Sequence, residues 1–448
     1  MSDRVVRARR APPTIAAPRW RYATVFALYA YQGLVAGFGT VAVPNAYAAT
    51  GWSTEAVGAH IATIGLPWIL QPLWGPIVDR YGGFAMGRRR FWVLTAFVAT
   101  LLALSVLLFL DGAPLPVVSA AFFVHSCAAG LMDTATDGMI MDDVPTERLG
   151  LTNAFTRAGF TTGMLAGSSG LAWLLPPLGL GGTTAVLMAA ALLIGTVPVR
   201  VRERDGDPAL SLRRDRTREA GRLPDLLREL GREVVRGGNL ALFAFCIAQE
   251  AAGTLLQVPL GVHLIQVQGW SAESLSSVQG LVTFLGGTAG ALLAGTWTDR
   301  VGSARALSVL IGLSAASNLL AAPLLAWSDP GVANLVGPAA LTLANLTSAL
   351  SYVALAPAVM AASRGPVAAT RFALYMAALN LGGVTGSAAA GHVASGIGLP
   401  LTAALSGLML AAAAAAAPSM VRRAAERAEQ PGRGTGAPSS ARPPPPQG

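Results

Sequence analysis

The chain has 448 residues, of which 53% are hydrophobic and only 12% charged, and its mean hydropathy is +0.53. In soluble domains about a quarter of the residues are charged, so this composition excludes a series of soluble domains and indicates a membrane protein. A net charge of +9 would suggest nucleic-acid binding in a soluble chain. In a membrane protein the topology accounts for this charge, and we expect anionic lipid headgroups, not nucleic acid, as its partners.

Apolar stretches long enough to cross about 30 Å of hydrocarbon predict twelve membrane-spanning helices. In chain order they cover residues 22–46, 55–78, 91–110, 114–141, 149–175, 180–199, 239–265, 273–297, 305–327, 331–362, 368–395 and 398–421. The predicted fold class is therefore an all-α integral membrane protein.

Arginine predicts the orientation of these spans, because positive side chains near span ends are retained in the cytoplasm. The chain has no lysine, so its 32 positive residues are all arginine. Apart from Arg157, they lie before the first span or near the ends of even-numbered spans, and the six opposite loops contain none. Both termini are thus predicted to be cytoplasmic. The replacement of lysine by arginine is typical of GC-rich bacteria, and we expect a bacterial inner-membrane location.

One pattern, G-x-x-x-D-R-x-G, occurs twice, as GPIVDRYG at 75–82 and as GTWTDRVG at 295–302. The offset matches the second span to the eighth, which predicts two parallel, pseudo-symmetric six-helix bundles. The predicted segments are a basic stretch 1–20, a bundle 21–199, an Arg-rich linker 200–237, a bundle 238–421 and a disordered tail 422–448. Within the linker, LPDLLRELGREVV has apolar residues at helical spacing and predicts a surface helix.

The repeated pattern is typical of a latch between helices that separate and re-engage. Its first glycine allows close backbone approach, its aspartate can cap a neighbouring helix, and its arginine faces anionic headgroups. The residues concerned are Gly75, Asp79, Arg80 and Gly82 in the first copy and Gly295, Asp299, Arg300 and Gly302 in the second.

On this motif the chain resembles the major facilitator superfamily, over about residues 20–420. Two further stretches are similar to the AmpG-type muropeptide permeases, the acetyl-CoA transporters and the siderophore permeases. One is LPWILQPLWGP with the extended loop that ends in Gly87, Arg88, Arg89 and Arg90. The resemblance implies that these four residues belong to the same gating loop as the first copy of the repeated pattern. The other is MDTATDGMIMDDVPTERLGLTNAF. The resemblance implies the fold of that superfamily and uptake of a muropeptide-like or siderophore-like solute.

The resemblance also places Asp133 and Asp137 at the paired-acid positions of that branch. The chain departs from the branch at Gln71, Met132 and Ile247, where its members usually have Lys, Gln and Lys. These departures concern the substrate and the coupling and leave the expected fold unchanged.

Charged residues inside spans are costly and are therefore candidates for function. Asp133 and Asp137 lie four residues apart on one helical face, with Asp133 near the midplane. Arg157 lies nearly as far beyond the turn at Pro145 as Asp133 lies before it, so we expect an ion pair between them that a proton or an anionic solute could break. The alternative is that the span stops at Met132 and that 133–148 is a hydrated loop.

Glu250 is the other acid near the midplane, and a carboxyl group away from water could load and release protons. Its alternative role is a neutral acid that is hydrogen-bonded to a neighbour. Four further polar residues at similar depth predict a shared aqueous cavity, although each alone could equally satisfy a helix contact. They are Gln32, His125, Asn345 and Asn380.

Together these features predict a secondary active transporter that works by alternating access and imports a bulky, amphipathic or anionic solute with protons, as a monomer. Without lysine there is no Walker A site and no Schiff base, so we expect no enzyme activity, and we expect no cofactor or metal. The alternatives are a proton-antiporting exporter of a drug or metabolite and a non-transporting scaffold or sensor. Exporters often carry Gly-Pro in span 5, which GMLAGSSG lacks, and a scaffold does not need midplane charges.

Overall fold

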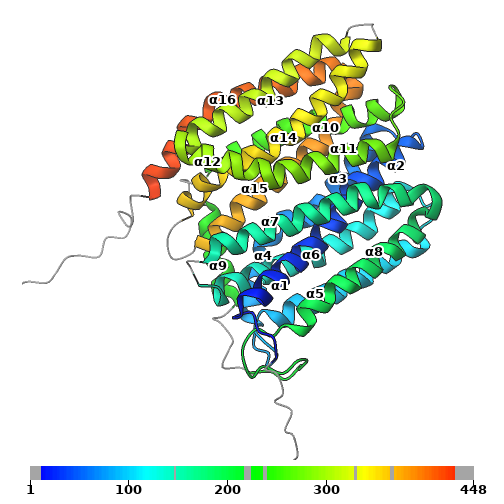
Figure 1. Ribbon diagram of the computed structural model, residues 1–448. Helices are drawn as coiled ribbons and strands as arrows, with labels where there is room; N and C mark the ends of the chain where they lie inside the picture. Colours follow the sequence, from blue (N-terminus) through cyan, green and yellow to red (C-terminus); the bar gives the residue numbers. More distant parts are fainter. Residues whose placement is uncertain are drawn as a thin grey trace, which may run out of the picture.

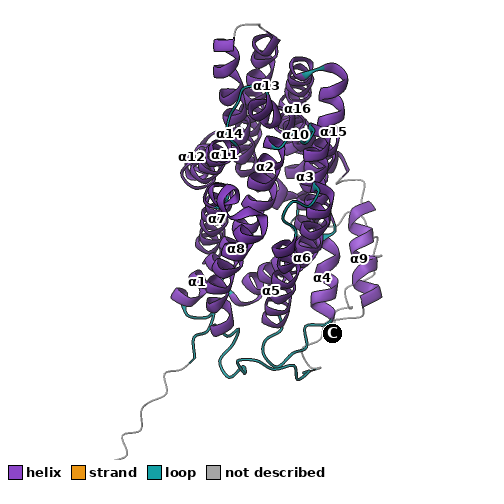
Figure 2. Ribbon diagram, turned by 90° about the vertical axis from the view of Figure 1, so that its right-hand side faces the viewer, coloured by secondary structure: helices purple, strands orange, loops and turns teal. Residues whose placement is uncertain are grey.

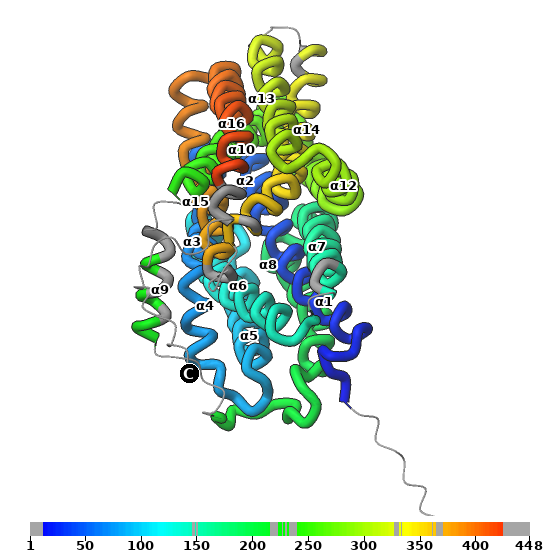
Figure 3. The backbone as a smooth tube through the Cα atoms, turned by 90° about the vertical axis from the view of Figure 1, so that its left-hand side faces the viewer, coloured from blue at the N-terminus to red at the C-terminus, as the bar shows by residue number. Residues whose placement is uncertain are grey.

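The computed structural model describes residues 12–145, 148–215, 223–235, 240–326, 330–363 and 368–428. Every named element in these ranges is a helix. Figure 1 shows the first half of the chain, blue to green, in the lower part of the molecule and the second half, green to red, above it. The tube in Figure 3, drawn from another side, shows the same separation. The predicted all-α membrane architecture is confirmed.

The first half begins with a long interrupted helix and ends at the linker. Its elements are α1 (Pro18–Gly37), η1 (Phe38–Ala42), α2 (Val43–Ala49), α3 (Thr54–Ile69), α4 (Gln71–Arg80), α5 (Arg90–Ser105), η2 (Val106–Phe109), α6 (Leu115–Asp143), α7 (Leu149–Leu165), η4 (Ala166–Gly170), η5 (Ala172–Leu174) and α8 (Leu175–Arg200).

The second half follows the linker helix α9 (Leu223–Val235). Its elements are α10 (Leu240–Gln266), α11 (Ala272–Leu285), η7 (Gly286–Gly290), α12 (Ala291–Val301), α13 (Ser303–Ala326), α14 (Pro330–Ala362), α15 (Ala368–Ile397) and α16 (Leu399–Ala428). We keep the boundaries of the two bundles, 21–199 and 238–421, as a proposal that a superposition of the halves would test.

Among the described residues, eleven helical stretches are long and apolar enough to span a membrane, and one of them, Leu151–Arg200, runs for 50 residues. A straight helix of that length would measure about 75 Å, more than twice the hydrocarbon thickness. Gly179 interrupts it with a φ of 69° and a non-helical ψ, a backbone conformation that favours glycine. When the stretch is divided there, the part of the chain that the structure describes has twelve such stretches, as predicted.

The linker helix agrees with its prediction, whereas the predicted tail begins too early. α9 covers the predicted LPDLLRELGREVV segment, and Figure 2 shows it beside α4, with which it is in contact. The last helix α16 continues to Ala428, so residues 422–428, predicted to start a disordered tail, are helical. The rest of the predicted tail, 429–448, and part of the linker, 216–222 and 236–239, lie outside the described residues.

Small residues let two pairs of helices pack backbone to backbone. A Cβ atom at Gly163 on α7 would collide with the carbonyl oxygen of Ala30 on α1, and one at Gly386 on α15 would collide with the backbone of Ala251 on α10. The glycine pair in η7, Gly286 and Gly290, differs, because Cβ atoms added there would lie nearest to leucine side chains of α14 and not to backbone. These stripes are Gly159, Gly163 and Gly167; Gly382 and Gly386; and Gly286 and Gly290.

Hydrogen bonds join the two halves at the end of the molecule that lacks arginine. Asn45 Nδ2 on α2 donates to Ser276 Oγ at 2.9 Å and to Gln279 Oε1 at 2.8 Å on α11. Gln266 Nε2, at the end of α10, donates to the carbonyl oxygen of Ala48 at 2.8 Å. The outer ends of α2, α10 and α11 are thereby held together.

Two more hydrogen bonds join the halves near mid-depth. The hydroxyl oxygens of Thr161 and Thr288 lie 3.1 Å apart, and Asn380 Nδ2 donates to the carbonyl oxygen of Trp68 at 3.4 Å. The molecule is therefore closed on its Arg-poor side.

Candidate solute and proton site

The paired acids lie inside an unbroken helix, so the alternative of a hydrated loop at 133–148 is wrong. α6 runs from Leu115 to Asp143, and Asp133 is 9% exposed. Asp133 Oδ1 accepts a hydrogen bond from Gln32 Nε2 at 3.0 Å, and its Oδ2 accepts one from Gln71 Nε2 at 2.5 Å. The hydroxyl of Tyr29 donates to Asp137. The acids are thus held by neutral donors from α1 and α4.

Arg157 does not form the expected ion pair with Asp133. It forms no ion pair with any described carboxylate, and its guanidinium carbon lies 5.9 Å from the centroid of the Tyr352 ring on α14. Tyr352 is also within electrostatic range of Asp133 and Asp137. The predicted equal depth does not lead to pairing, because α7 directs Arg157 toward the second half, beside Gly287.

Glu250 lies on α10 and faces the glycine stripe of α15. A Cβ atom at Gly382 would lie 2.8 Å from the Glu250 Cβ, so the small residue makes room for this side chain. Among the described residues, its carboxyl group accepts one hydrogen bond, from the adjacent Gln249 Nε2 at 3.4 Å. Glu250 is therefore hydrogen-bonded to a neighbour, as in its alternative role, but by one long bond from the adjacent residue.

The four predicted cavity residues do not share one site. Gln32 bonds to Asp133, as described above. His125 is buried within the first half, with its Nε2 3.4 Å from the hydroxyl of Tyr31. Asn380 contacts the end of α3 through the Trp68 carbonyl oxygen. Of these three residues, only Asn380 therefore forms a hydrogen bond to the other half.

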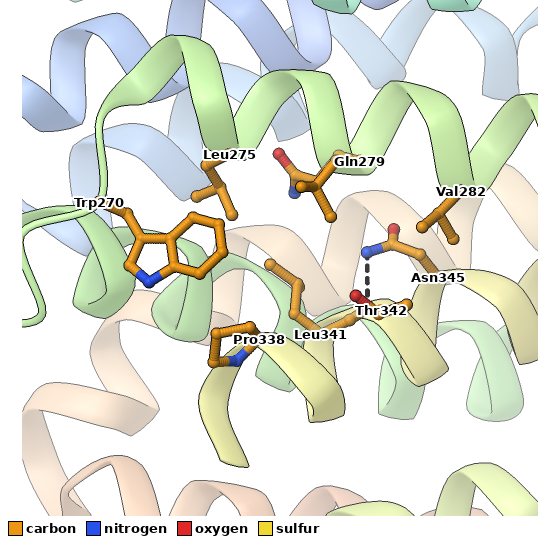
Figure 4. A pocket seen from close by; sticks show the side chains of 9 residues that line it. Trp270, Leu275, Gln279, Val282, Pro338, Leu341, Thr342 and Asn345 are labelled. Atoms are coloured by element: carbon orange, nitrogen blue, oxygen red, sulfur yellow. Dashed lines mark hydrogen bonds between the residues drawn. The ribbon is translucent and has the colours of Figure 1, made fainter. Parts of the chain in front are cut away.

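Asn345 lines a separate hollow within the second half, between α11 and α14. Its Nδ2 donates to the carbonyl oxygen of Leu341 one turn earlier, at 2.8 Å, so its amide is satisfied by its own helix (Figure 4). Trp270, Gln279 and Pro338 line the same hollow. The walls are mainly apolar, and the prediction that Asn345 joins the acids is wrong.

The first copy of the repeated motif forms an ionic network at the Arg-rich end. Asp79 Oδ1 accepts from Arg88 Nη2 at 3.0 Å and from Arg89 Nη1 at 2.7 Å. Arg89 Nε also donates to Asp142 at the end of α6, at 2.8 Å. Burial opposes the charge of Arg89, but the carboxylates of Asp79 and Asp142 raise its pKa above the usual value. The latch aspartate is thus engaged within its own half.

The structure corrects two expectations about the motif: that its first glycine allows a close helix approach, and that its second copy forms the same latch as the first. A Cβ atom at Gly75 would meet nothing within 4 Å, and one at Gly295 would meet only Val353 Cγ1, at 3.9 Å, so neither glycine serves a close helix approach here. Asp299 and Arg300 are exposed. The second copy is shorter, because Gly302, with a φ of 84°, leads directly into α13. It has no loop equivalent to that carrying Arg88 and Arg89.

Sequence reasoning missed three residues of the interior. Tyr29 and Tyr352 contact the charged groups but read as ordinary apolar positions in a span. Gln71 was noted only as a departure from the related permeases. The signal available for all three was a hydrogen-bonding side chain at the depth of the acids, a signal too common in spans to select them.

Comparison with known proteins identifies the family of the chain. The family model of the Major Facilitator Superfamily matches residues 25–365. The chain belongs to the Major Facilitator Superfamily. It is 28% identical over 323 residues to the anhydromuropeptide permease of Escherichia coli strain K12, covering 72% of this chain and 64% of that protein. It is 25% identical over 269 residues to the putative transporter AmpG 3 of Rickettsia prowazekii strain Madrid E, covering 56% and 62% of the two.

Solved structures support the fold. The D-xylose-proton symporter gives a TM-score of 0.63 at 14% identity over 89% of this chain and 96% of that one. The nucleoside transporter NupG gives 0.63 at 11% identity over 90% and 99%. The predicted superfamily transporter resembling AmpG-type permeases is confirmed. The chain spans less than two thirds of the length of the curated relatives it matches.

Proposed function

We propose that this transporter imports a bulky, anionic, muropeptide-like solute together with protons across the bacterial inner membrane, by alternating access. The observation that carries the proposal is Arg157: a mostly buried guanidinium at the junction of the halves with no described carboxylate as its partner. An uncompensated cation in such a place is costly unless an anion binds to it. A carboxylate of the solute would supply that anion.

The acids have a separate task in this proposal. Asp133, Asp137 and Glu250 can each take up a proton as the neutral form becomes favourable away from water. Tyr352 lies over Arg157 and within electrostatic range of the paired acids, so an anion that binds Arg157 changes the field at Asp133 and Asp137. Protonation of the acids and binding of an anionic solute would thereby favour each other, which is the requirement for symport.

The closed Arg-poor side supports a state that is open toward the cytoplasm, if the Arg-rich side is cytoplasmic as predicted. The hydrogen bonds of Asn45 with Ser276 and Gln279 would then break when the transporter opens outward. The similarity to the anhydromuropeptide permease supports a muropeptide-like solute. Export by proton antiport would use the same acids, and sided transport assays would distinguish it.

A binding experiment tests the role of Arg157. The purified protein is titrated with an anhydromuropeptide that ends in a carboxylate and with the same compound ending in a carboxamide. We expect the wild type to prefer the carboxylate at least tenfold, since a charge-assisted hydrogen bond contributes about 1.5–3 kcal/mol. Arg157→Gln should lose this preference, and Arg19→Gln, which changes an exposed arginine in the first turn of α1, should keep it. Equal preference in wild type and Arg157→Gln would refute the assignment.

A further inference from the structure

The carboxylate of Glu203, just after α8, lies beneath the loop that joins α4 to α5. Its Oε1 accepts the backbone N–H of Arg88 at 3.1 Å, and its Oε2 accepts those of Arg89 and Arg90 at 2.9 Å and 2.8 Å. Glu203 is only 3% exposed. Gly87 precedes this nest with a φ of 121°, and a Cβ atom there would lie 2.6 Å from Oε2. The Gly-Arg-Arg-Arg sequence thus fits closely around one buried acid.

The same loop presents its guanidinium groups to other partners. Arg88 and Arg89 extend to Asp79, and Arg89 also reaches Asp142. Three consecutive N–H groups bound by one carboxylate fix the backbone from which these side chains leave. Glu203 is therefore connected to the latch aspartate through the two arginines and does not contact it directly.

The segment around Glu203 is tied to the first half on both sides. Arg90 donates to the carbonyl oxygens of Val199 and Ala209, both at 2.7 Å. Further along, the backbone N–H of Ala85 donates to the carbonyl oxygen of Arg213 at 2.9 Å. This segment is the start of the linker to the second half, so Glu203 lies on the covalent path between the two bundles.

We propose that Glu203 is a positioning residue that keeps Arg88 and Arg89 on Asp79, and so opposes closure of the Arg-rich side. Replacing its carboxylate by an amide puts an N–H donor beside the three backbone N–H donors of the loop. The lost hydrogen bonds should free the loop from its fixed position. Asp79 then becomes free to engage the second half. The proposal rests on the alternating access of the proposed function, but it does not depend on the solute or on protons.

The test measures the distance between the halves without any solute. Spin labels are attached at Tyr81→Cys and Ser303→Cys in full-length protein that lacks Cys127 and Cys246, and electron–electron distances are recorded in lipid nanodiscs. We expect Glu203→Gln to raise the ratio of closed to open populations on the Arg-rich side by roughly fivefold to tenfold. Glu203→Asp should lie between Glu203→Gln and the wild type.

The matched control is Asp205→Asn, which removes an exposed carboxylate two residues away and should leave the ratio unchanged. An unchanged ratio in Glu203→Gln, or an equal change in Asp205→Asn, would overturn the proposal. Hydrogen exchange on the unmodified protein gives a second readout if the variant does not fold. The amides of Arg88, Arg89 and Arg90 should exchange as slowly as the interior of α5, and rapid exchange would also overturn it.

Discussion

The separation of Asp133 from Arg157 leads to a quantitative prediction about their mutants. If the two formed a buried ion pair, Asp133→Asn would leave a guanidinium uncompensated and would cost about 3–5 kcal/mol of unfolding free energy. In the structure Asp133 instead accepts two hydrogen bonds, from Gln32 and Gln71. Hydrogen bonds between membrane helices contribute about 0.6 kcal/mol on average and up to about 1.7. Asp133→Asn should therefore cost about 1–3 kcal/mol.

A double-mutant cycle separates the two cases more sharply than the single mutant. Asp133→Asn, Arg157→Gln and the double variant are purified, and their unfolding free energies are measured by SDS titration in mixed micelles. Because the two residues share no hydrogen bond, their effects should add, with a coupling energy below about 1 kcal/mol. A coupling energy of about 3 kcal/mol, with stability recovered in the double variant, would show that the ion pair exists and would refute our reading of the site.

Three further predictions follow from the packing and the polar groups. Glu250→Gln should fold and exchange solute across proteoliposomes but fail to accumulate it against a gradient, and normal uphill uptake would exclude Glu250 as a proton carrier. Gly163→Val puts side-chain atoms against the α1 backbone and should lower the free energy of unfolding, measured by thermal unfolding, by about 3 kcal/mol or more. Gly170→Ala, in open space, should change it by less than about 0.5 kcal/mol. Equal effects of the two variants would contradict this packing. Asn45→Ala removes two hydrogen bonds between the halves and should shift the population about fivefold to thirtyfold toward opening on the Arg-poor side, as cysteine labelling from that side would show; unchanged labelling would count against the closed interface.

The fold could be predicted from the sequence because each of its signals repeats along the chain. Arginine marks alternate span ends, and the D-R motif recurs in the second and eighth spans. The linker helix was predictable from the helical spacing of its apolar residues. Even the turn at Gly179, which divides a 50-residue helical stretch, lies between two spans that the arginine pattern requires to be separate.

The contacts of the site could not be predicted in the same way, because depth in the membrane does not fix rotation about a helix axis. Asp133 and Arg157 are predicted to lie at similar depth, yet one contacts α1 and α4 and the other contacts α14. Asn345 has a suitable depth too, but its amide bonds to its own helix. The contacts of Glu203 could not be predicted for a different reason. It lies in a charged linker, where an acid among arginines usually indicates a solvated surface.

Proton movement into liposomes shows whether an anionic solute and protons enter together. The transporter is reconstituted with a pH-sensitive dye trapped inside, and a carboxylate-terminated anhydromuropeptide is added outside without any pre-formed gradient. We predict that the lumen acidifies as the labelled solute enters, and that Arg157→Gln abolishes both signals. Entry of the solute with no change in luminal pH would show that protons do not accompany it.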